Sequence, residues 1–242
     1  MCHPWLAAGV ICFIVVQSLR EIGPVLVRRE VGTEEPVSGL LGARVRGWFR
    51  GRVDPLVDAF LAAGVTANLV TGLQLVASVL CGVAYGVGWI FTAGWVLITS
   101  GTLDVVDGAI ARKGGVAGRR GAFLDSVVDR YGEGAVFAGL IVHFREGWSL
   151  WVVLAAFFGS LMVSYTRARA EGLGMECTVG LMQRAERYVV LGGGSMASSL
   201  AVHLTCAVAP SHDILLASVA VVAVLANATA LQRAVFAARR LL

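Results

Sequence analysis

The chain has 242 residues, of which 57% are hydrophobic and only 15% are charged, and its mean hydropathy is +0.77. A soluble domain of this length has about 25% charged residues, so the composition excludes an ordinary soluble fold and indicates a membrane protein. The net charge of +4 does not indicate a nucleic-acid partner, because the basic residues cluster between apolar segments instead of along one soluble face.

The N-terminal part of the chain divides into an unassigned region and an amphipathic segment. Residues 1–43 hold an apolar stretch followed by a polar connector, and the pattern assigns them no role. Residues 44–63 interleave arginines with apolar side chains, which is typical of a helix lying at a cytoplasmic membrane surface. The alternative for this segment is an ordinary amphipathic helix packed on protein. We expect the membrane domain to cover residues 44–242.

Six apolar segments of about the length that crosses a bilayer follow the amphipathic segment. They cover residues 67–87, 90–112, 122–144, 148–170, 185–208 and 213–236. Alternate connections fall on one side of the membrane, and Arg145 is the sole basic residue expected on that side. Cytoplasmic connections carry the excess of basic residues, so the opposite side is cytoplasmic. The sequence predicts an all-α integral membrane protein with six transmembrane helices, preceded by a cytoplasmic juxtamembrane amphipathic helix.

Four carboxylates stand inside the second and third of these segments. Asp104 and Asp107 are three residues apart and therefore project from one face of a helix. Asp125 and Asp129, four apart, do the same on the next helix. A short glycine-rich turn at 113–121 brings the two helices together, so we expect all four carboxylates in one pocket near the cytoplasmic surface. A charge inside a bilayer costs at least about 2.5–3.5 kcal/mol, and bound Mg²⁺ or Mn²⁺ would compensate these carboxylates.

Small and basic residues beside the aspartates point to a phosphate ligand. Gly108 and Ala111 leave room for a ligand to approach the helix backbone, and Arg112 can reach a phosphate at the helix end. The alternative is a structural ion-pair network in a transporter, or a bare cation site. It is less favoured, because the local basic residues do not pair off four carboxylates at helical spacing.

The pattern D-x2-D-G-x2-A-R-x8-G-x3-D-x3-D, from Asp104 to Asp129, resembles that of the CDP-alcohol phosphatidyltransferases at every fixed position. The resemblance covers roughly residues 45–240. It implies a six-helix membrane domain that forms a homodimer, contacts membrane lipids and opens its site to the cytoplasm. It further implies an enzyme of phospholipid biosynthesis, which transfers a phosphatidyl-type group from a CDP-lipid to a polar alcohol and releases CMP.

The resemblance also implies roles for individual residues, with two divalent ions, Mg²⁺ or Mn²⁺, in each site. The metal ligands would be Asp104, Asp107, Asp125 and Asp129. Asp129 would also act as the general base that takes the proton of the acceptor hydroxyl. The CDP moiety would contact Asn68, Thr71, Asp104, Gly108, Ala111, Arg112, Gly121 and Asp125.

Arginines near the ends of the fourth and fifth segments bear on the acceptor. Arg184 and Arg187 share a helix face. Arg167 and Arg169 point in nearly opposite directions, so one faces the pocket while the other can pair with Glu171. About three guanidinium groups directed at one site suit a phosphate on the acceptor, which a neutral alcohol would not need. The alternative is flanking charge of the kind that marks cytoplasmic helix ends.

The sequence around these arginines also looks like the branch that makes phosphatidylinositol phosphate or its archaeal ether-lipid equivalent, with inositol 1-phosphate as acceptor. Gln183 stands where glutamate is usual in that branch. The resemblance maps the acceptor phosphate to Arg167, Arg169, Arg184, Arg187 and Arg233. One alternative is the same chemistry with glycerol 3-phosphate or another alcohol. An alternative of another class is a non-catalytic membrane scaffold or a divalent-cation transporter.

Overall fold

The computed structural model describes residues 41–205 and 209–241, and these residues form seven α-helices and no strand. The apolar stretch and most of the polar connector expected within residues 1–43 lie outside the described residues. The helices are α2 (Gly42–Ala62), α3 (Ala67–Gly86), α4 (Ile90–Lys113), α5 (Arg119–His143), α6 (Ser149–Glu171), α7 (Arg184–Thr205) and α8 (Ala209–Arg240). Each predicted segment therefore corresponds to one helix, with ends that differ by a few residues.

Local signals in the sequence account for several helix ends. The side chain of Thr66 accepts a hydrogen bond from the backbone amide of Leu69 and so caps the start of α3. Gly115, in the turn between α4 and α5, has φ +66°, a left-handed conformation that glycine adopts without steric cost. The chain turns here from α4 into α5, but both helices pack mainly on α3 and not on each other, so the expectation that they return side by side is wrong.

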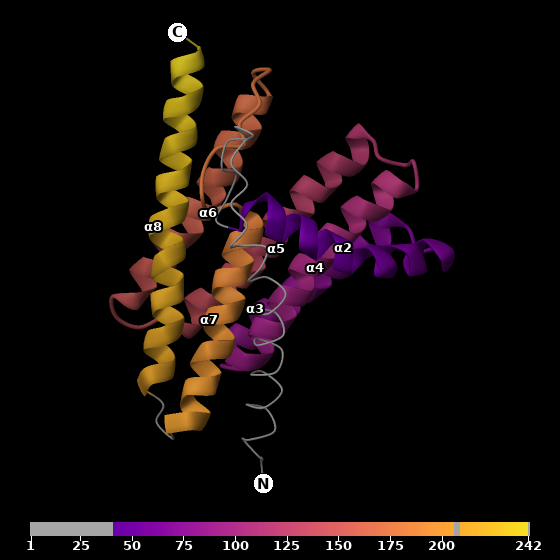
Figure 1. Cartoon of the computed structure of the whole chain (residues 1–242). Coiled ribbons are helices and arrows are strands. Elements are labelled where there is room, and N and C mark those ends of the chain that lie inside the picture. Colours follow the sequence, from indigo (N-terminus) through magenta and orange to yellow (C-terminus); the bar gives the residue numbers. More distant parts are fainter. Residues whose placement is uncertain (1–40, 206–208, 242) are drawn as a thin grey trace.

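The helices form one packed bundle around a shared hydrophobic core (Figure 1). The closest packing joins α6 to α8, and α3 to both α4 and α5, while α7 lies against α4 and α8. At the crossing of α3 and α5, a Cβ added to Gly82 would collide with the backbone carbonyl of Ala135, and one added to Gly139 with the backbone of Gly82. Glycines at this crossing let the two backbones approach closely, as in many membrane helix pairs.

Helix α2 runs crosswise to the rest of the bundle (Figure 1). Its buried Val53 and Val57 form a second, smaller apolar cluster with α3 and α4. Arg46 of α2 forms an ion pair with the buried Glu186 at the start of α7. One face of this amphipathic helix therefore packs on protein, and its location at a membrane surface stays a prediction.

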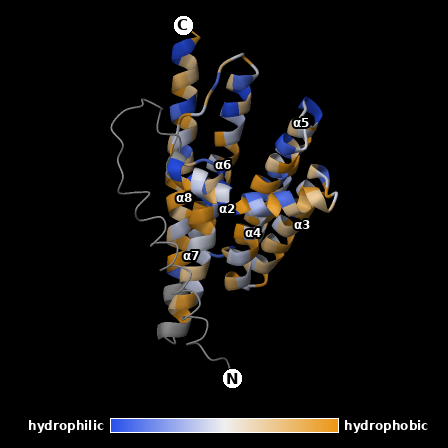
Figure 2. Cartoon of the chain, turned by 45° about the vertical axis from the view of Figure 1, so that its right-hand side comes forward, coloured by the Kyte–Doolittle hydropathy of each residue, from blue (hydrophilic) through white to orange (hydrophobic). Residues whose placement is uncertain are grey.

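Apolar residues cover much of the length of the helices, and hydrophilic residues gather at their ends (Figure 2). Within the described part of the chain, four helices are long and apolar enough to cross a membrane: α3, α4, α6 and, in α8, residues 212–240. Helix α5 does not meet this standard because it carries Asp129, Arg130 and Glu133 in its middle. Helix α7 also falls short, since glycine and serine lower the hydropathy of its middle. An all-α membrane protein is confirmed, whereas a count of six membrane crossings is not.

Candidate active site at the ends of α4 and α5

Three of the four predicted carboxylates converge where α4 ends and α5 begins. Asp104, Asp107 and Asp125 each place one carboxylate oxygen within 4.8 Å of the other two. Asp107 is buried, and the other two are partly buried. Asp129 is not in this group of three, although it is buried nearby and shares a cationic partner with Asp104. The four carboxylates predicted to share one pocket therefore lie together, with Asp129 joined to the group of three through this shared cation.

Two neutral donors on helix α3 each bind one of the four aspartates, one aspartate on α4 and one on α5. The Thr71 hydroxyl donates to Asp107 Oδ2 at 2.8 Å, and Gln74 Nε2 donates to Asp129 Oδ1 at 3.1 Å. Thr71 and Gln74 are three residues apart and therefore share a face of α3. The Gln74 side chain is fully buried. Helix α3 thus fixes the orientation of carboxylates on both α4 and α5.

Arg184, at the start of α7, lies among the aspartates. Its Nη1 is 2.6 Å from Asp104 Oδ1 and also forms an ion pair with Asp129 Oδ1. Its Nη2 donates to the Tyr188 hydroxyl at 3.2 Å. The sequence expectation concerned basic residues close to the aspartates in sequence, whereas Arg184 comes from a distant helix and pairs with two of the carboxylates. Sequence spacing did not reveal this contact, because α4 and α7 meet only in the folded bundle.

The carboxylate group is suited to a divalent cation. Three oxygen ligands from Asp104, Asp107 and Asp125 match the preference of Mg²⁺ and Mn²⁺ for carboxylates. The Oδ1 atom of Asp125 is buried and has no hydrogen-bond partner among the described residues. A buried, unpartnered carboxylate oxygen is costly, and coordination to a cation would satisfy it.

The residues predicted to contact CDP lie around this group at different depths. Gly108 and Ala111 are partly buried on α4, whereas Asn68, Arg112 and Gly121 are exposed. A Cβ added to Gly108 would come within 3.2 Å of Arg112 Nη1. The absence of a side chain at position 108 therefore lets the Arg112 guanidinium fold over this turn of α4.

The five arginines predicted for the acceptor phosphate do not all point at one space. Arg167 pairs with Glu171 at 2.7 Å, and Arg169 is exposed. Arg187 is buried against Glu133, and the buried Arg233 donates to the backbone carbonyls at 163 and 179. Of Arg167 and Arg169, it is therefore Arg167 that has the predicted partner Glu171.

Polar residues of this region that were not predicted include Gln74, Arg130 and Glu133. Glu133 follows Asp129 by four residues, so it continues the acidic face of α5, and this spacing could have revealed it. Gln74 follows Thr71 by three residues inside an apolar segment, which is a comparable signal. Arg130 has no such signal, because the residue after an aspartate ordinarily points elsewhere on the helix.

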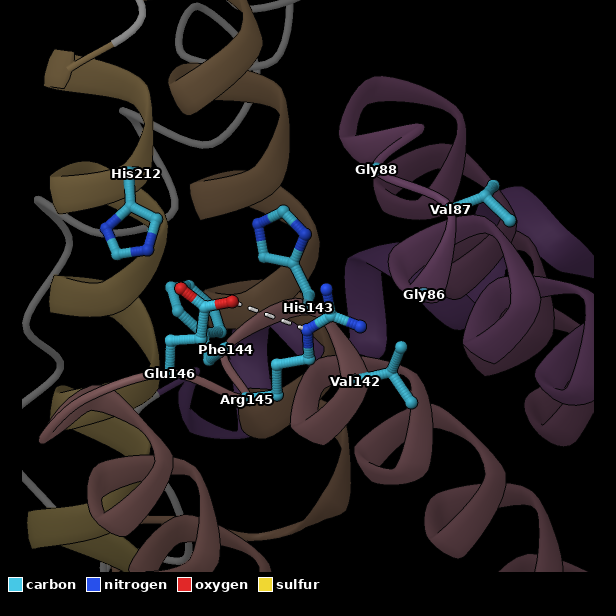
Figure 3. Close-up of a pocket in the computed structure, with 9 residues that line it drawn as sticks. All are labelled: Gly86, Val87, Gly88, Val142, His143, Phe144, Arg145, Glu146 and His212. Atoms are coloured by element: carbon cyan, nitrogen blue, oxygen red, sulfur yellow. Dashed lines mark ion pairs between the residues drawn. The ribbon is translucent and has the colours of Figure 1, made fainter.

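A separate pocket of about 450 Å³ lies at the opposite end of the bundle (Figure 3). It is formed where α3 and α5 end and near the start of α8. Its lining residues are Gly86, Val87, Gly88, Val142, His143, Phe144, Arg145, Glu146 and His212. It contains none of the residues predicted for the active site.

Comparisons with known proteins agree with this geometry. Residues 64–226 match the family described as CDP-alcohol phosphatidyltransferase. The archaetidylinositol phosphate synthase of Methanothermobacter thermautotrophicus is 37% identical over 148 residues, which are 61% of this chain and 73% of that protein. The phosphatidylinositol phosphate synthase of Mycobacteroides abscessus is 38% identical over 167 residues, 67% of this chain and 74% of that protein.

Solved structures of a similar enzyme share the fold. The phosphatidylinositol phosphate synthase of Mycobacterium tuberculosis with CDP-DAG bound is 30% identical, with a TM-score of 0.66 over 76% of this chain and 92% of that chain. The same enzyme in complex with manganese and citrate gives a TM-score of 0.67 over 76% of this chain and 87% of that chain. The aspartate pattern, its geometry and these similarities together show that the chain is an integral membrane enzyme belonging to the CDP-alcohol phosphatidyltransferase family.

Proposed function

We propose that the chain transfers a phosphatidyl-type group from a CDP-lipid, CDP-diacylglycerol or its ether analogue, to inositol 1-phosphate and releases CMP. The observation that carries this proposal is the convergence of Asp104, Asp107 and Asp125 within 4.8 Å, beside Asp129 and Arg184. The names of the relatives support the acceptor, since they make phosphatidylinositol phosphate or its archaeal counterpart. CDP-DAG in the related structure supports the donor.

The metal ligands in this proposal are Asp104, Asp107 and Asp125, with Asp129 completing a site for two ions. Manganese in the related structure and the unpartnered Asp125 oxygen both support a divalent ion. When bound, such ions offset the negative charge of a diphosphate and of departing CMP. We assign the CDP moiety to the carboxylates Asp104 and Asp125 and to the surrounding residues Asn68, Thr71, Gly108, Ala111, Arg112 and Gly121.

Asp129 is the proposed general base. It takes the proton of the acceptor hydroxyl, whose oxygen attacks the β-phosphorus of the CDP-lipid. The bond between that phosphorus and the CMP oxygen then breaks, and CMP departs with the electron pair. Gln74 and Arg184 support this role because both hold the same oxygen, Oδ1, and so fix the carboxylate.

We assign the acceptor phosphate to Arg167, Arg169, Arg184, Arg187 and Arg233. Arg233 is close enough to Arg167 and Arg187 for their charges to interact, which supports a shared electropositive region. A phosphate dianion would relieve the repulsion among these guanidinium groups. We also propose six membrane crossings, a site that faces the cytoplasm and a homodimer.

The test is CMP release from CDP-diacylglycerol by the purified protein with Mg²⁺ or Mn²⁺. Inositol 1-phosphate, glycerol 3-phosphate, inositol and serine are supplied in parallel. We expect release with inositol 1-phosphate, and its loss in the Asp125→Asn variant. Release with glycerol 3-phosphate alone would retain the chemistry and replace the acceptor. No release from folded, metal-binding protein would favour a scaffold or a cation transporter.

A further inference from the structure

The two carboxylate oxygens of Asp129 have different surroundings. Oδ1 accepts a hydrogen bond from Gln74 at 3.1 Å and forms the ion pair with Arg184. Oδ2 forms an ion pair with Arg130, whose Nη2 is 3.8 Å away. A separation of 3.8 Å is too long for a hydrogen bond. Oδ2 is therefore the oxygen of Asp129 to which no donor of residues 41–205 and 209–241 makes a hydrogen bond.

Arg130 is held by two other groups. Its Nη1 donates to Glu133 Oε2 at 3.1 Å and to the Ser164 hydroxyl on α6. Glu133 lies one turn after Arg130 on α5, so the two side chains share a face of the helix. Both contacts use Nη1, and they fix the guanidinium at a distance from Asp129.

Glu133 is a buried carboxylate that is shared between two arginines. Its side chain is 2% exposed, and each oxygen has its own partner. Oε1 accepts from Arg187 Nε at 2.8 Å, and Oε2 accepts from Arg130. Arg187 alone would already balance one buried negative charge. Neutralising Glu133 therefore does not require the second contact, to Arg130, and the effect of this contact is to hold Arg130 in place.

A guanidinium released beside a carboxylate moves into direct contact with it, because charge-assisted hydrogen bonds are about twice as strong as neutral ones. Arg130 adjoins Asp129 in sequence and already lies 3.8 Å from Oδ2. If Glu133 and Ser164 did not hold it, Arg130 would close this gap and occupy Oδ2. Both oxygens of Asp129 would then be bound by arginines, and neither oxygen would be free to accept a proton from a substrate.

We propose that Glu133, assisted by Ser164, is a positioning residue that holds Arg130 away from Asp129 and so keeps Oδ2 open to the acceptor hydroxyl. This role rests on the proposed function, in which Asp129 is the general base. Glu133 itself touches neither substrate nor the reacting atoms. Its effect on the reaction passes through Arg130.

The test is a double-mutant cycle on CMP release at saturating CDP-lipid, acceptor and metal. Glu133→Gln is expected to lower kcat by about 10- to 100-fold, which is part of the roughly 10²–10⁴-fold that a general base supplies. Adding Arg130→Met removes the guanidinium that would block Oδ2. The double variant is therefore expected to have a kcat about tenfold higher than that of Glu133→Gln, because the effects of mutating two residues in contact do not simply add.

If Glu133→Gln does not fold, a less disruptive variant tests the same inference. Ser164→Ala removes one of the two groups that hold Arg130 and leaves every buried charge paired. We expect a fall in kcat of about two- to fivefold, in keeping with the loss of one hydrogen bond, and recovery when Arg130→Met is added. Glu146→Gln is the matched control, because Glu146 is an exposed partner of Arg145 at the opposite end of the bundle.

The outcomes separate this inference from the proposed function. Wild-type protein that releases no CMP with any acceptor overturns both. Active wild-type protein in which Arg130→Met rescues neither Glu133→Gln nor Ser164→Ala overturns the inference alone. A Glu133→Gln defect confined to the KM for the acceptor would also overturn it, since that result assigns Glu133 to holding Arg187 at the acceptor phosphate. Rescue of kcat by Arg130→Met supports the inference, because a purely structural defect would not improve when a second residue is lost.

Discussion

At the scale of single residues, neutral donors from one helix hold two of the four carboxylates of the site. Thr71 and Gln74 of α3 each hold one oxygen of Asp107 and Asp129 respectively. Where carboxylates bind a metal, loss of a residue that holds them typically lowers metal affinity or activity by about 10- to 100-fold. Each of these two donors can be removed without changing the shape of the side chain.

Gln74→Met removes the donor to Asp129 Oδ1 and retains a side chain of similar length. We expect kcat to fall by about tenfold, because hydrogen bonds to charged groups are worth about 1.5–3 kcal/mol. Unfolding stability is expected to change little, since Gln74 Oε1 is buried without a partner among the described residues and its removal relieves that cost. CMP release and thermal unfolding in detergent measure the two effects. Gln232→Met, at an exposed position of α8, is the control.

Thr71→Val removes the hydroxyl that donates to Asp107 Oδ2 at 2.8 Å. The metal concentration that gives half-maximal activity is expected to rise by about tenfold, the lower end of the effect seen when such supporting residues are lost. Activity at saturating metal is expected to recover in large part. Thr99→Val is the control, because the Thr99 hydroxyl donates only to a carbonyl of its own helix. An unchanged metal dependence would show that Thr71 does not orient Asp107.

At the scale of whole helices, the distance between α3 and α5 decides whether Gln74 can reach Asp129. Gly82 and Gly139 allow this distance, because a side chain on either would meet the backbone of the other helix. The crossing lies within the same pair of helices that carries Gln74 and Asp129. Close packing of two glycines therefore contributes to the site without touching it.

Gly139→Ala tests this dependence. The added methyl group would collide with the backbone of Gly82, which cannot move aside as a side chain can. We expect a loss of stability of about 1–3 kcal/mol, typical of overpacking, together with a fall in kcat as α3 shifts away from α5. Gly134→Ala on the same helix is the matched control, because its Cβ would meet nothing within 4 Å. Equal behaviour of the two variants would contradict a close crossing of α3 and α5.

At the scale of the whole molecule, the two ends of the bundle differ in their charged residues and in the sites that they form. The aspartates of the site lie where α4 ends and where α5 and α7 begin, and Arg112, Arg119 and Arg184 lie at the same helix ends. The histidine-lined pocket lies at the opposite end, beside Arg145 and Glu146 (Figure 3). This asymmetry is the one that the sequence predicts between the cytoplasmic and outer sides.

Cysteine labelling in intact cells tests the orientation of the bundle and the crossing by α6. In a chain whose five native cysteines are replaced, Glu146→Cys is expected to react with a membrane-impermeant thiol reagent from outside. Glu176→Cys, in the connection between α6 and α7, is expected to react only after permeabilisation. Both positions are exposed, so access and not burial determines the result. Labelling of both from the same side would contradict a crossing by α6, and with it the proposed topology.

The sequence by itself determined the helices and the chemistry of the aspartates. Apolar segments separated by glycine and charged residues predicted α3–α8 to within a few residues, since the length of a bilayer crossing and the helical period are local properties. The same period placed Asp104 and Asp107 on one helix face, and the glycine content of residues 113–121 put Gly115 in a turn. Such relations depend on one helix or one turn, so no tertiary structure is needed to derive them.

Only the tertiary structure decided which partners these side chains have. Arg184 lies 80 residues from Asp104 in sequence, and the two meet because α7 packs on α4. Gln74 and Glu133 likewise acquire their roles from neighbouring helices that the period of their own helix does not specify. A helical repeat fixes which residues share a face, but the packing of side chains between helices determines which faces meet. For that reason the sequence identified the carboxylates, and the fold identified the residues that orient them and that hold neighbouring arginines in place.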